Sequence, residues 1–288
     1  MNEKVLKNKK YEIDMCSGNL FKKIIIFCIP LALMGMLQLL YNTADLIIVS
    51  NFSGDKEALG AVGSTSSLIN LIVNLFMGLS VGTNVVCAKM YGSKDYDGMK
   101  KAIHTSILVS FISGLFLGLI GIVFADGLLN LMSNDLALSR VYLRIYFIGM
   151  PFNMLYNFAS AVLRAVGDTK RPLYYLTIAG IVNVILNLIF VIFFHMSVAG
   201  VALATIISQV ISAFLVMRAL IKTNMPYKVQ LKELKIHSKQ LKEIIRIGLP
   251  AGIQSSIFAI SNVIIQSSVN KFGSSVMNGN SAASSVEG

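Results

Sequence analysis

The residues best suited to chemistry lie in one stretch, QLLYNTADLIIVS, at positions 38–50. It contains Asp45, which is the one acidic residue inside a run apolar enough to cross a membrane. Gln38, Asn42 and Asp45 recur at helical spacing and therefore share one face of a helix. A charged side chain at mid-helix costs about 2.5–3.5 kcal/mol on insertion scales, so a chain that keeps one usually binds something with it. The alternative is a structural ion pair, for example with Arg144.

Polar side chains also interrupt the later apolar runs. Asn183 and Asn187 form an i, i+4 pair, and Thr205 shares a helical face with Gln209 and Ser212. In hydrocarbon these groups must be satisfied within the protein, so we expect them to point into a helix bundle. Hydrogen bonding between helices would explain them without function, at about 0.6–2 kcal/mol each. Beside a carboxylate, however, they would form a site of one negative charge and several neutral oxygens.

Composition indicates an all-α membrane protein. The 288 residues are 55% hydrophobic and 14% charged, with a mean hydropathy of +0.70, whereas soluble domains have about 25% charged residues. A span needs about 20 apolar residues, and the first run is too long for a signal peptide. The sequence predicts an eighth helix that begins near Val276 and seven spans near 24–49, 59–88, 103–124, 139–163, 172–194, 198–221 and 245–270.

The net charge is +11, and the basic residues lie mainly in the gaps between apolar runs. This distribution indicates membrane topology and not a nucleic-acid partner. If the N-terminus is cytoplasmic, 21 of the 25 lysines and arginines face the cytoplasm, and the exceptions are Lys56, Arg140, Arg144 and Lys271. The positive-inside rule therefore predicts a multi-pass protein of the cell membrane with a cytoplasmic N-terminus.

The chain repeats part of its own beginning. Ile29-Pro30 is echoed by Leu249-Pro250, and Phe52 by Phe272, at the same offset of 220 residues. Six spans lie between the copies, which is typical of parallel repeats. We therefore expect a polytopic transmembrane helix bundle with one six-helix repeat plus the start of a second. The predicted parts are a cytoplasmic tail at 1–22, an N-lobe at 23–221, a cytoplasmic amphipathic linker at 222–246 and an incomplete C-lobe at 247–288.

The linker is predicted to form a helix on the membrane surface. Leu231, Leu234, Leu241 and Ile245 recur at helical spacing within 226–246, and lysines lie off that stripe.

Catalytic and metal-binding patterns are weak. Gly78-Leu79-Ser80-Val81-Gly82 matches a nucleophile elbow, but it lies inside a long apolar run, where its glycines suit close helix packing. Asp45 has no second acid for acid–base chemistry. Cys16, Cys28 and Cys87 have no ligand spacing. We expect no enzyme activity and no cofactor.

Several stretches, taken in order, closely resemble the MATE (multidrug and toxic compound extrusion) family of cation-coupled drug transporters. They are IPLALMGMLQLLYNTADLIIVSNFSG at 29–54, ALGAVGS at 58–64, GLSVGTNVVCAKMYGSKD at 78–95, LRAVGDTKRP at 163–172, VNVILNLIFV at 182–191 and AGVALATIISQ at 199–209. The resemblance runs from about residue 17 to the end. It implies two six-helix lobes around a cavity that opens alternately to each side, and exchange of protons or sodium ions for organic cations.

The resemblance also implies roles for residues. Asp45 matches the acid of the first helix, with Gln38 and Asn42 on the same face. Asn183 and Asn187 match the polar pair of the fifth helix, and Thr205 matches the threonine of the sixth. A coupling proton or Na⁺ would then bind at Asp45, with Na⁺ also held by Asn183, Asn187 and Thr205.

The sequence departs from the family pattern in two ways. Many members have an aspartate where this chain has Asn187, and no acid follows Arg246 in the seventh run, so coupling would rest on Asp45. Complete members have twelve helices, and this chain ends where the eighth should start. We therefore expect a truncated antiporter that needs a missing second lobe or a homodimer partner. The alternatives are a lipid-linked oligosaccharide flippase, which should carry basic residues in its cavity, and a fragment that does not transport.

Overall fold

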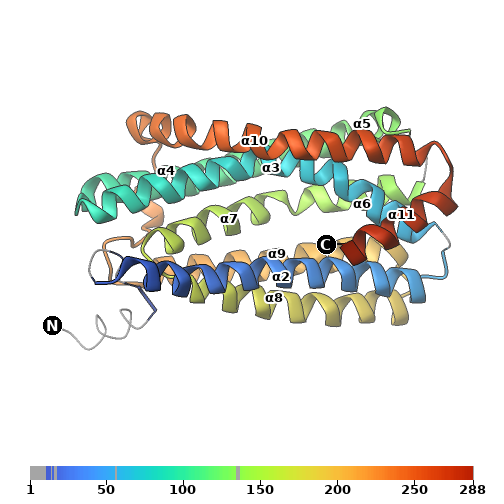
Figure 1. Ribbon diagram of the computed structural model, residues 1–288, viewed down its shortest axis with the longest axis horizontal. Helices are drawn as coiled ribbons and strands as arrows, with labels where there is room; N and C mark the ends of the chain where they lie inside the picture. The colour runs from blue at the N-terminus through green and yellow to red at the C-terminus, as the bar shows by residue number, and fades with distance from the viewer. Residues whose placement is uncertain (1–10, 14, 16–17, 56, 134–136, 288) are drawn as a thin grey trace.

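The chain folds into a bundle of long helices that run along one common direction (Figure 1). The computed structural model describes residues 11–287 except 14, 16, 17, 56 and 134–136, so Cys16, Lys56 and the basic tail at 1–10 lie outside the described residues. The helices are α2 (Leu20–Phe52), α3 (Ala58–Gly92), α4 (Tyr96–Val123), α5 (Ala125–Leu131), α6 (Ala137–Ile148), α7 (Met150–Ala165), α8 (Lys170–Leu188), α9 (Ser197–Lys222), α10 (Ser238–Asn270) and α11 (Ser274–Glu287).

Six of these segments are long and apolar enough to cross a membrane: α2, α3, α4, α9, α10, and α8 together with the π-helical turn Ile189–Phe193 that continues it. The part of the chain that the structure describes contains no strand. The predicted all-α, multi-span architecture is confirmed, and α11 begins close to the predicted start of the eighth helix.

The predicted fourth span at 139–163 is two helices, because the chain breaks at Gly149 between α6 and α7. Pro151 lies in the first turn of α7. Proline has no N–H to donate, and its ring clashes with the carbonyl four residues earlier, which disfavours one continuous helix here. Gly149 also faces α9, where an added Cβ would lie 2.6 Å from Gln209 Oε1.

The prediction of one amphipathic helix over 226–246 is wrong. The structure has a single 3₁₀ turn at Leu231–Glu233, and α10 begins at Ser238. Two backbone N–H groups of this linker donate to side chains of α4. His104 Nε2 accepts from Gln230 N at 3.1 Å, and Thr105 Oγ1 accepts from His237 N at 3.0 Å. Since these N–H groups already have partners, the helical ladder does not form.

Glycines bring α3 and α10 into backbone contact. A Cβ added at Gly78 would lie 2.2 Å from Gly252 N, and one added at Gly248 would lie 2.7 Å from Gly78 O. Gly82 is equally close to the backbone of α10. This confirms that Gly78 and Gly82 form a packing face and not a nucleophile elbow.

The polar residues of α10 differ in their exposure. Gln254, Ser255 and Asn262 are exposed, but Gln266 is only 5% exposed. Its side chain donates to Asn270 Oδ1 at 2.9 Å and accepts from Asn280 Nδ2 of α11 at 3.0 Å. α11 therefore covers the end of α10.

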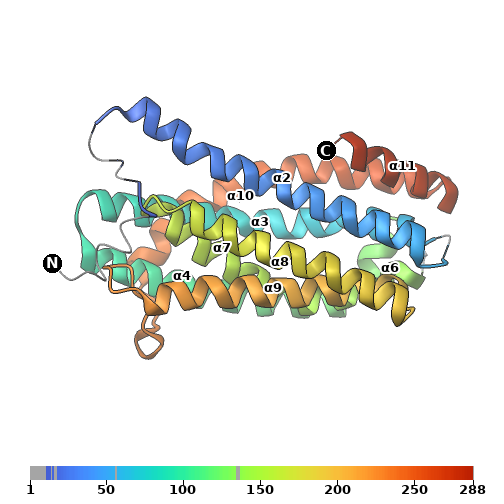
Figure 2. The ribbon, with the colours of Figure 1, turned by 90° about the horizontal axis from the view of Figure 1, so that it is seen from below.

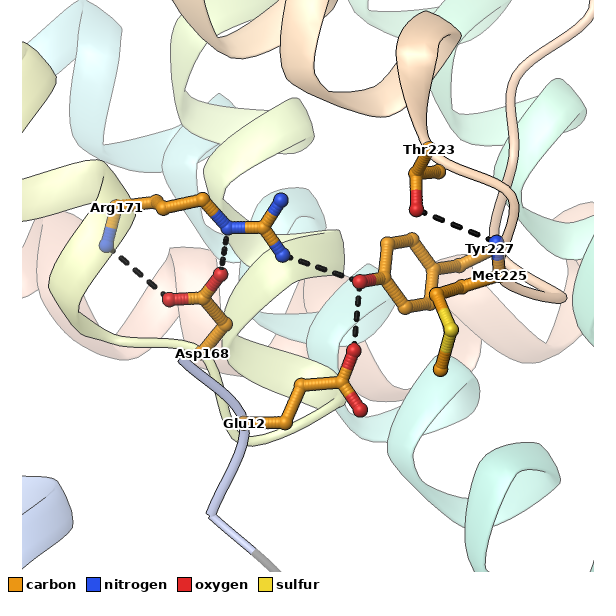
Figure 3. A network of polar contacts seen from close by, with 6 residues as sticks. All are labelled: Glu12, Asp168, Arg171, Thr223, Met225 and Tyr227. Atoms are coloured by element: carbon orange, nitrogen blue, oxygen red, sulfur yellow. Dashed lines mark hydrogen bonds and ion pairs between the residues drawn. The ribbon is translucent and has the colours of Figure 1, made fainter. Parts of the chain in front are cut away.

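Four side chains join three distant segments at the end of the bundle where α2 begins (Figure 3). We call Glu12, Asp168, Arg171 and Tyr227 the junction cluster. Arg171 Nε donates to Asp168, and Arg171 Nη2 donates to the hydroxyl of Tyr227 at 3.0 Å. That hydroxyl donates to Glu12 Oε1 at 2.7 Å. The segment before α2, the α7–α8 loop and the linker are thereby tied together.

Candidate functional site

Asp45 is buried in α2, with 7% of its surface exposed, and it meets the polar faces of α8 and α9. Asn187 Nδ2 donates to Asp45 Oδ1 at 2.5 Å and to Asn183 Oδ1 at 3.2 Å. Asn183 Nδ2 in turn lies 3.5 Å from Thr205 Oγ1, at the limit of a hydrogen bond. One chain of contacts thus joins the acid, the amide pair and the threonine that the sequence singled out.

A glycine allows α2 to approach α8 at this point. A Cβ added at Gly180 would lie 1.8 Å from the ring of Tyr41, so any larger residue would push α2 away. The Tyr41 hydroxyl donates to Thr177 O at 3.4 Å, which anchors the ring against α8. Asp45 is one helical turn beyond Tyr41, and Asn187 is two turns beyond Gly180. The close contact therefore sets the depth at which Asp45 meets Asn187.

The alternative ion pair between Asp45 and Arg144 is wrong. Arg144 Nη2 pairs with Asp126 Oδ2 at 2.9 Å, and Arg140 Nε pairs with the other oxygen of Asp126 at 2.7 Å. Within the described residues, Asp45 takes part in no ion pair. A buried carboxylate with only neutral partners is not explained by helix locking.

Asp45 faces a cavity of about 310 Å³. Of the predicted site residues, all but Asn187 line it: Gln38, Asn42, Asp45, Asn183 and Thr205. Asn187 is fully buried behind Asp45. Among the described residues that line this cavity, Asp45 is the only charged one.

Other polar residues of the cavity were not singled out from the sequence. They come from α2, α3, α6, α7 and α9, and are Tyr41, Asn70, Asn74, Tyr142, Tyr146, Asn153, Tyr156, Asn157 and Ser208. Tyr142 and Tyr146 are an i, i+4 pair, as are Asn153 and Asn157, whose side chains are hydrogen-bonded at 3.0 Å. The spacing that revealed Asn183 and Asn187 was therefore also present here.

The cavity offers oxygen ligands to a cation. Behind Asp45, Asn187 Oδ1 is buried and has no hydrogen-bond partner among the described residues, although the nitrogen of the same amide contacts Asp45. Carboxylate, carbonyl and hydroxyl oxygens suit hard cations. The described residues contain no cluster of three His, Cys, Asp or Glu side chains that would suit a transition metal. The site can hold a proton on Asp45, or a monovalent cation between Asp45 and its neutral neighbours.

Membrane-length helices around an internal polar cavity with a single carboxylate define a polytopic membrane protein. The chain belongs to the MatE family, whose profile matches residues 30–189. Its relatives include "Probable multidrug resistance protein YpnP" of Bacillus subtilis (strain 168), which is 30% identical over 274 residues, or 92% of this chain and 60% of the relative. "Multidrug export protein MepA" of Staphylococcus aureus (strain MRSA252) is 25% identical over 256 residues, or 88% of this chain and 56% of the relative.

Solved structures of family members agree with the fold. One is described as the inward-facing conformation of a multidrug resistance MATE family transporter of the MOP superfamily; its TM-score is 0.78 at 26% identity, over 90% of this chain and 60% of that chain. A second structure, described as the outward-facing conformation, has a TM-score of 0.77 at 27% identity, over 85% of this chain and 55% of that chain. These relatives are transporters and not enzymes. The chain spans about three fifths of the length of the relatives it matches.

Proposed function

We propose that the chain is the cation-coupling part of a secondary transporter, which exports organic cations or drugs in exchange for H⁺ or Na⁺. The observation that carries this proposal is the buried Asp45 carboxylate, whose only described side-chain partner is the neutral amide of Asn187. The names of the relatives, which describe multidrug resistance and export, support the substrate class. The site residues are Asp45, Gln38, Asn42, Asn183, Asn187 and Thr205.

Exchange would follow from competition for Asp45. Ionised Asp45 attracts a cation, and rotation of the Asn187 amide would add its unpaired oxygen to the site. Protonated Asp45 has no charge and holds the cation weakly. Since one group binds both, each ligand weakens the other by the same free energy, which is the thermodynamic basis of antiport.

The rings beside Asp45 favour an organic cation. Tyr142 and Tyr146 line the cavity with their ring centroids 6.0 Å apart. Aromatic faces attract cations, by about 0.5–2 kcal/mol depending on desolvation. A flippase for a pyrophosphate-linked lipid would instead need basic groups in this cavity, and the described lining residues include no lysine or arginine.

The proposal includes a membrane orientation and a partner surface. The basic loops place the N-terminus in the cytoplasm of a cell-membrane protein. Alternating access in such transporters is a motion of one bundle against another around a shared site. We assign the second bundle to a further lobe, or to a second copy of this chain.

Replacing Asp45 tests the proposal directly. The purified 1–288 chain in detergent would be titrated with a fluorescent quaternary ammonium dye at pH 6 and pH 8, with and without Na⁺. The parent chain should bind more tightly at pH 8, and Asp45→Asn should bind at least tenfold more weakly and without pH dependence. Asp126→Asn removes an exposed carboxylate outside the cavity and should bind like the parent. Normal pH-dependent binding by Asp45→Asn would show that the assignment is wrong.

A further inference from the structure

A second cavity, of about 630 Å³, lies at the end of the bundle where α2 begins and shares no lining residue with the Asp45 cavity. It is bounded by the segment before α2, by α2, by the last turns of α3 and by the end of α7. In Figure 2, the N-terminal half of α2 stands apart from the other helices at this end. Its lining residues are Glu12, Ile13, Met15, Phe27, Asn84, Ala88, Tyr91, Gly92, Arg164, Ala165, Val166 and Gly167.

Within the part of the chain that the structure describes, Arg164 has no counter-ion in this cavity. The structure pairs its guanidinium with no carboxylate of the described residues, and the titratable group that acts on it is the neutral hydroxyl of Tyr156. Neighbouring basic residues are different. Arg171 is paired with Asp168, and Lys100 with Glu233. An arginine that lines a cavity at the end of the bundle and has no carboxylate partner among the described residues is available to an anionic ligand.

The carboxylate in the same cavity does not neutralise Arg164. Glu12 belongs to the junction cluster, and Figure 3 shows it directed at Tyr227. It accepts from Tyr227 at 2.7 Å and from Tyr91 at 3.4 Å. The charges that act on it are those of Arg171 and Asp168. Two hydroxyl donors and Arg171 therefore satisfy Glu12, and Arg164 stays available for an external anion.

The rest of the cavity is suited to an apolar group. Phe27, Ile13, Met15 and Ala88 line it, and Phe21, one and a half turns before Phe27 on α2, is 74% exposed. A volume of several hundred Å³ is typical of pockets that enclose a small ligand. The combination of one guanidinium and an apolar wall matches an anionic head group attached to a hydrocarbon chain.

We propose that this cavity binds a phosphate-bearing anion, with Arg164 as the residue that recognises its charge. An acidic phospholipid and free phosphate share this chemistry. The guanidinium fork would donate two hydrogen bonds to the phosphate oxygens. A lipid would also place its first methylene groups against Phe27.

Native mass spectrometry of the 1–288 chain in detergent would test the proposal with phosphatidylglycerol, phosphatidylcholine and inorganic phosphate as separate probes. The parent chain should retain phosphatidylglycerol in preference to phosphatidylcholine. Arg164→Gln should reduce that binding about tenfold or more, as expected for loss of a charge-assisted pair. Ala88→Phe should have the same effect by filling the cavity while its charge is kept. Arg218→Gln is the matched control, because it removes an exposed arginine from α9 outside the cavity.

The outcomes separate the possibilities. Binding of phosphatidylglycerol that is lost in both cavity variants and kept in the control supports a lipid site. Displacement of that lipid by millimolar inorganic phosphate, or binding of phosphate alone, identifies free phosphate as the source. Equal lipid binding by the parent, Arg164→Gln and Arg218→Gln would overturn the proposal, because Arg164 would then only extend toward the membrane surface. Equal retention of the two lipids by the parent would overturn it as well. Dye binding at Asp45 verifies that each variant is folded.

Discussion

Because residue 187 is an asparagine and not an aspartate, the site has one carboxylate that can gain or lose a proton. In this chain its amide nitrogen donates to Asp45, so a single carboxylate carries the charge of the cavity. Asn187→Asp would place a second carboxylate within hydrogen-bonding distance of the first. Two such acids titrate as a coupled pair, and one proton is held more tightly.

We expect Asn187→Asp to release more protons per cation bound near neutral pH than the parent chain. The measurement is proton release in weakly buffered detergent solution on addition of the quaternary ammonium dye. Asn157→Asp is a useful comparison, because it adds an acid to α7 within the same cavity but away from the Asp45–Asn187 contact. Unchanged proton release in Asn187→Asp would contradict the geometry of α2 against α8.

The sequence predicted one part of the site and missed another for physical reasons. Asp45, Asn183 and Thr205 interrupt strongly apolar runs. Because a polar group in hydrocarbon costs free energy, the sequence alone marks these residues as candidates for a site. Tyr142 and Tyr146 are amphipathic and can lie in a membrane without such a cost, so their position in the cavity required the fold. Asn153 and Asn157 lie together in α7 and were within reach of the same spacing rule.

At the scale of elements, the α3–α10 crossing depends on the absence of side chains. Gly78→Ala would place a methyl group 2.2 Å from Gly252 N, which only a shift of the backbone can relieve. Overpacking of this kind typically costs about 1–3 kcal/mol. We expect a lower thermal unfolding midpoint in detergent and easier proteolysis of α10.

Gly35→Ala provides the control for that prediction. An added Cβ at Gly35 meets no heavy atom within 4 Å, and alanine is favoured over glycine in a helix by about 1 kcal/mol. This variant should be as stable as the parent or more stable. If Gly78→Ala unfolds at the same temperature as Gly35→Ala, the crossing is looser than described.

The linker shows where periodicity misleads. Leu231 and Leu234 have the spacing of an amphipathic helix, and a membrane surface would favour that form. The backbone instead bonds to His104 and Thr105 on α4. These two residues lie more than a hundred positions earlier in the chain, so the local sequence of the linker does not predict these hydrogen bonds.

At the scale of the whole molecule, the junction cluster makes stability depend on pH. Burial raises the pKa of Glu12 above its ordinary value of 4.5, and the Tyr227 hydroxyl and the charge of Arg171 offset only part of that effect. A raised pKa in the folded state means that the contribution of Glu12 is fully present below its unfolded pKa and is lost as pH rises through the folded pKa.

Glu12→Gln should therefore reduce the pH dependence of unfolding. Between pH 4 and pH 7 the parent should lose more of its thermal midpoint than Glu12→Gln, because glutamine accepts from Tyr227 without becoming charged. Asp55→Asn, which changes an exposed carboxylate in the α2–α3 loop, should follow the parent curve. If the thermal midpoints of Glu12→Gln and the parent change with pH in parallel, burial does not raise the pKa of Glu12.

The junction cluster also sets an order of events during synthesis. Glu12 and Tyr227, whose side chains are in direct contact, are 215 residues apart in the chain. At about 5–20 residues per second, the ribosome adds Tyr227 roughly 10–40 s after Glu12. During that interval α2 to α9 are made while the segment before α2 still lacks the Tyr227 hydroxyl. The segment before α2 is therefore among the last parts of this bundle to reach its final position.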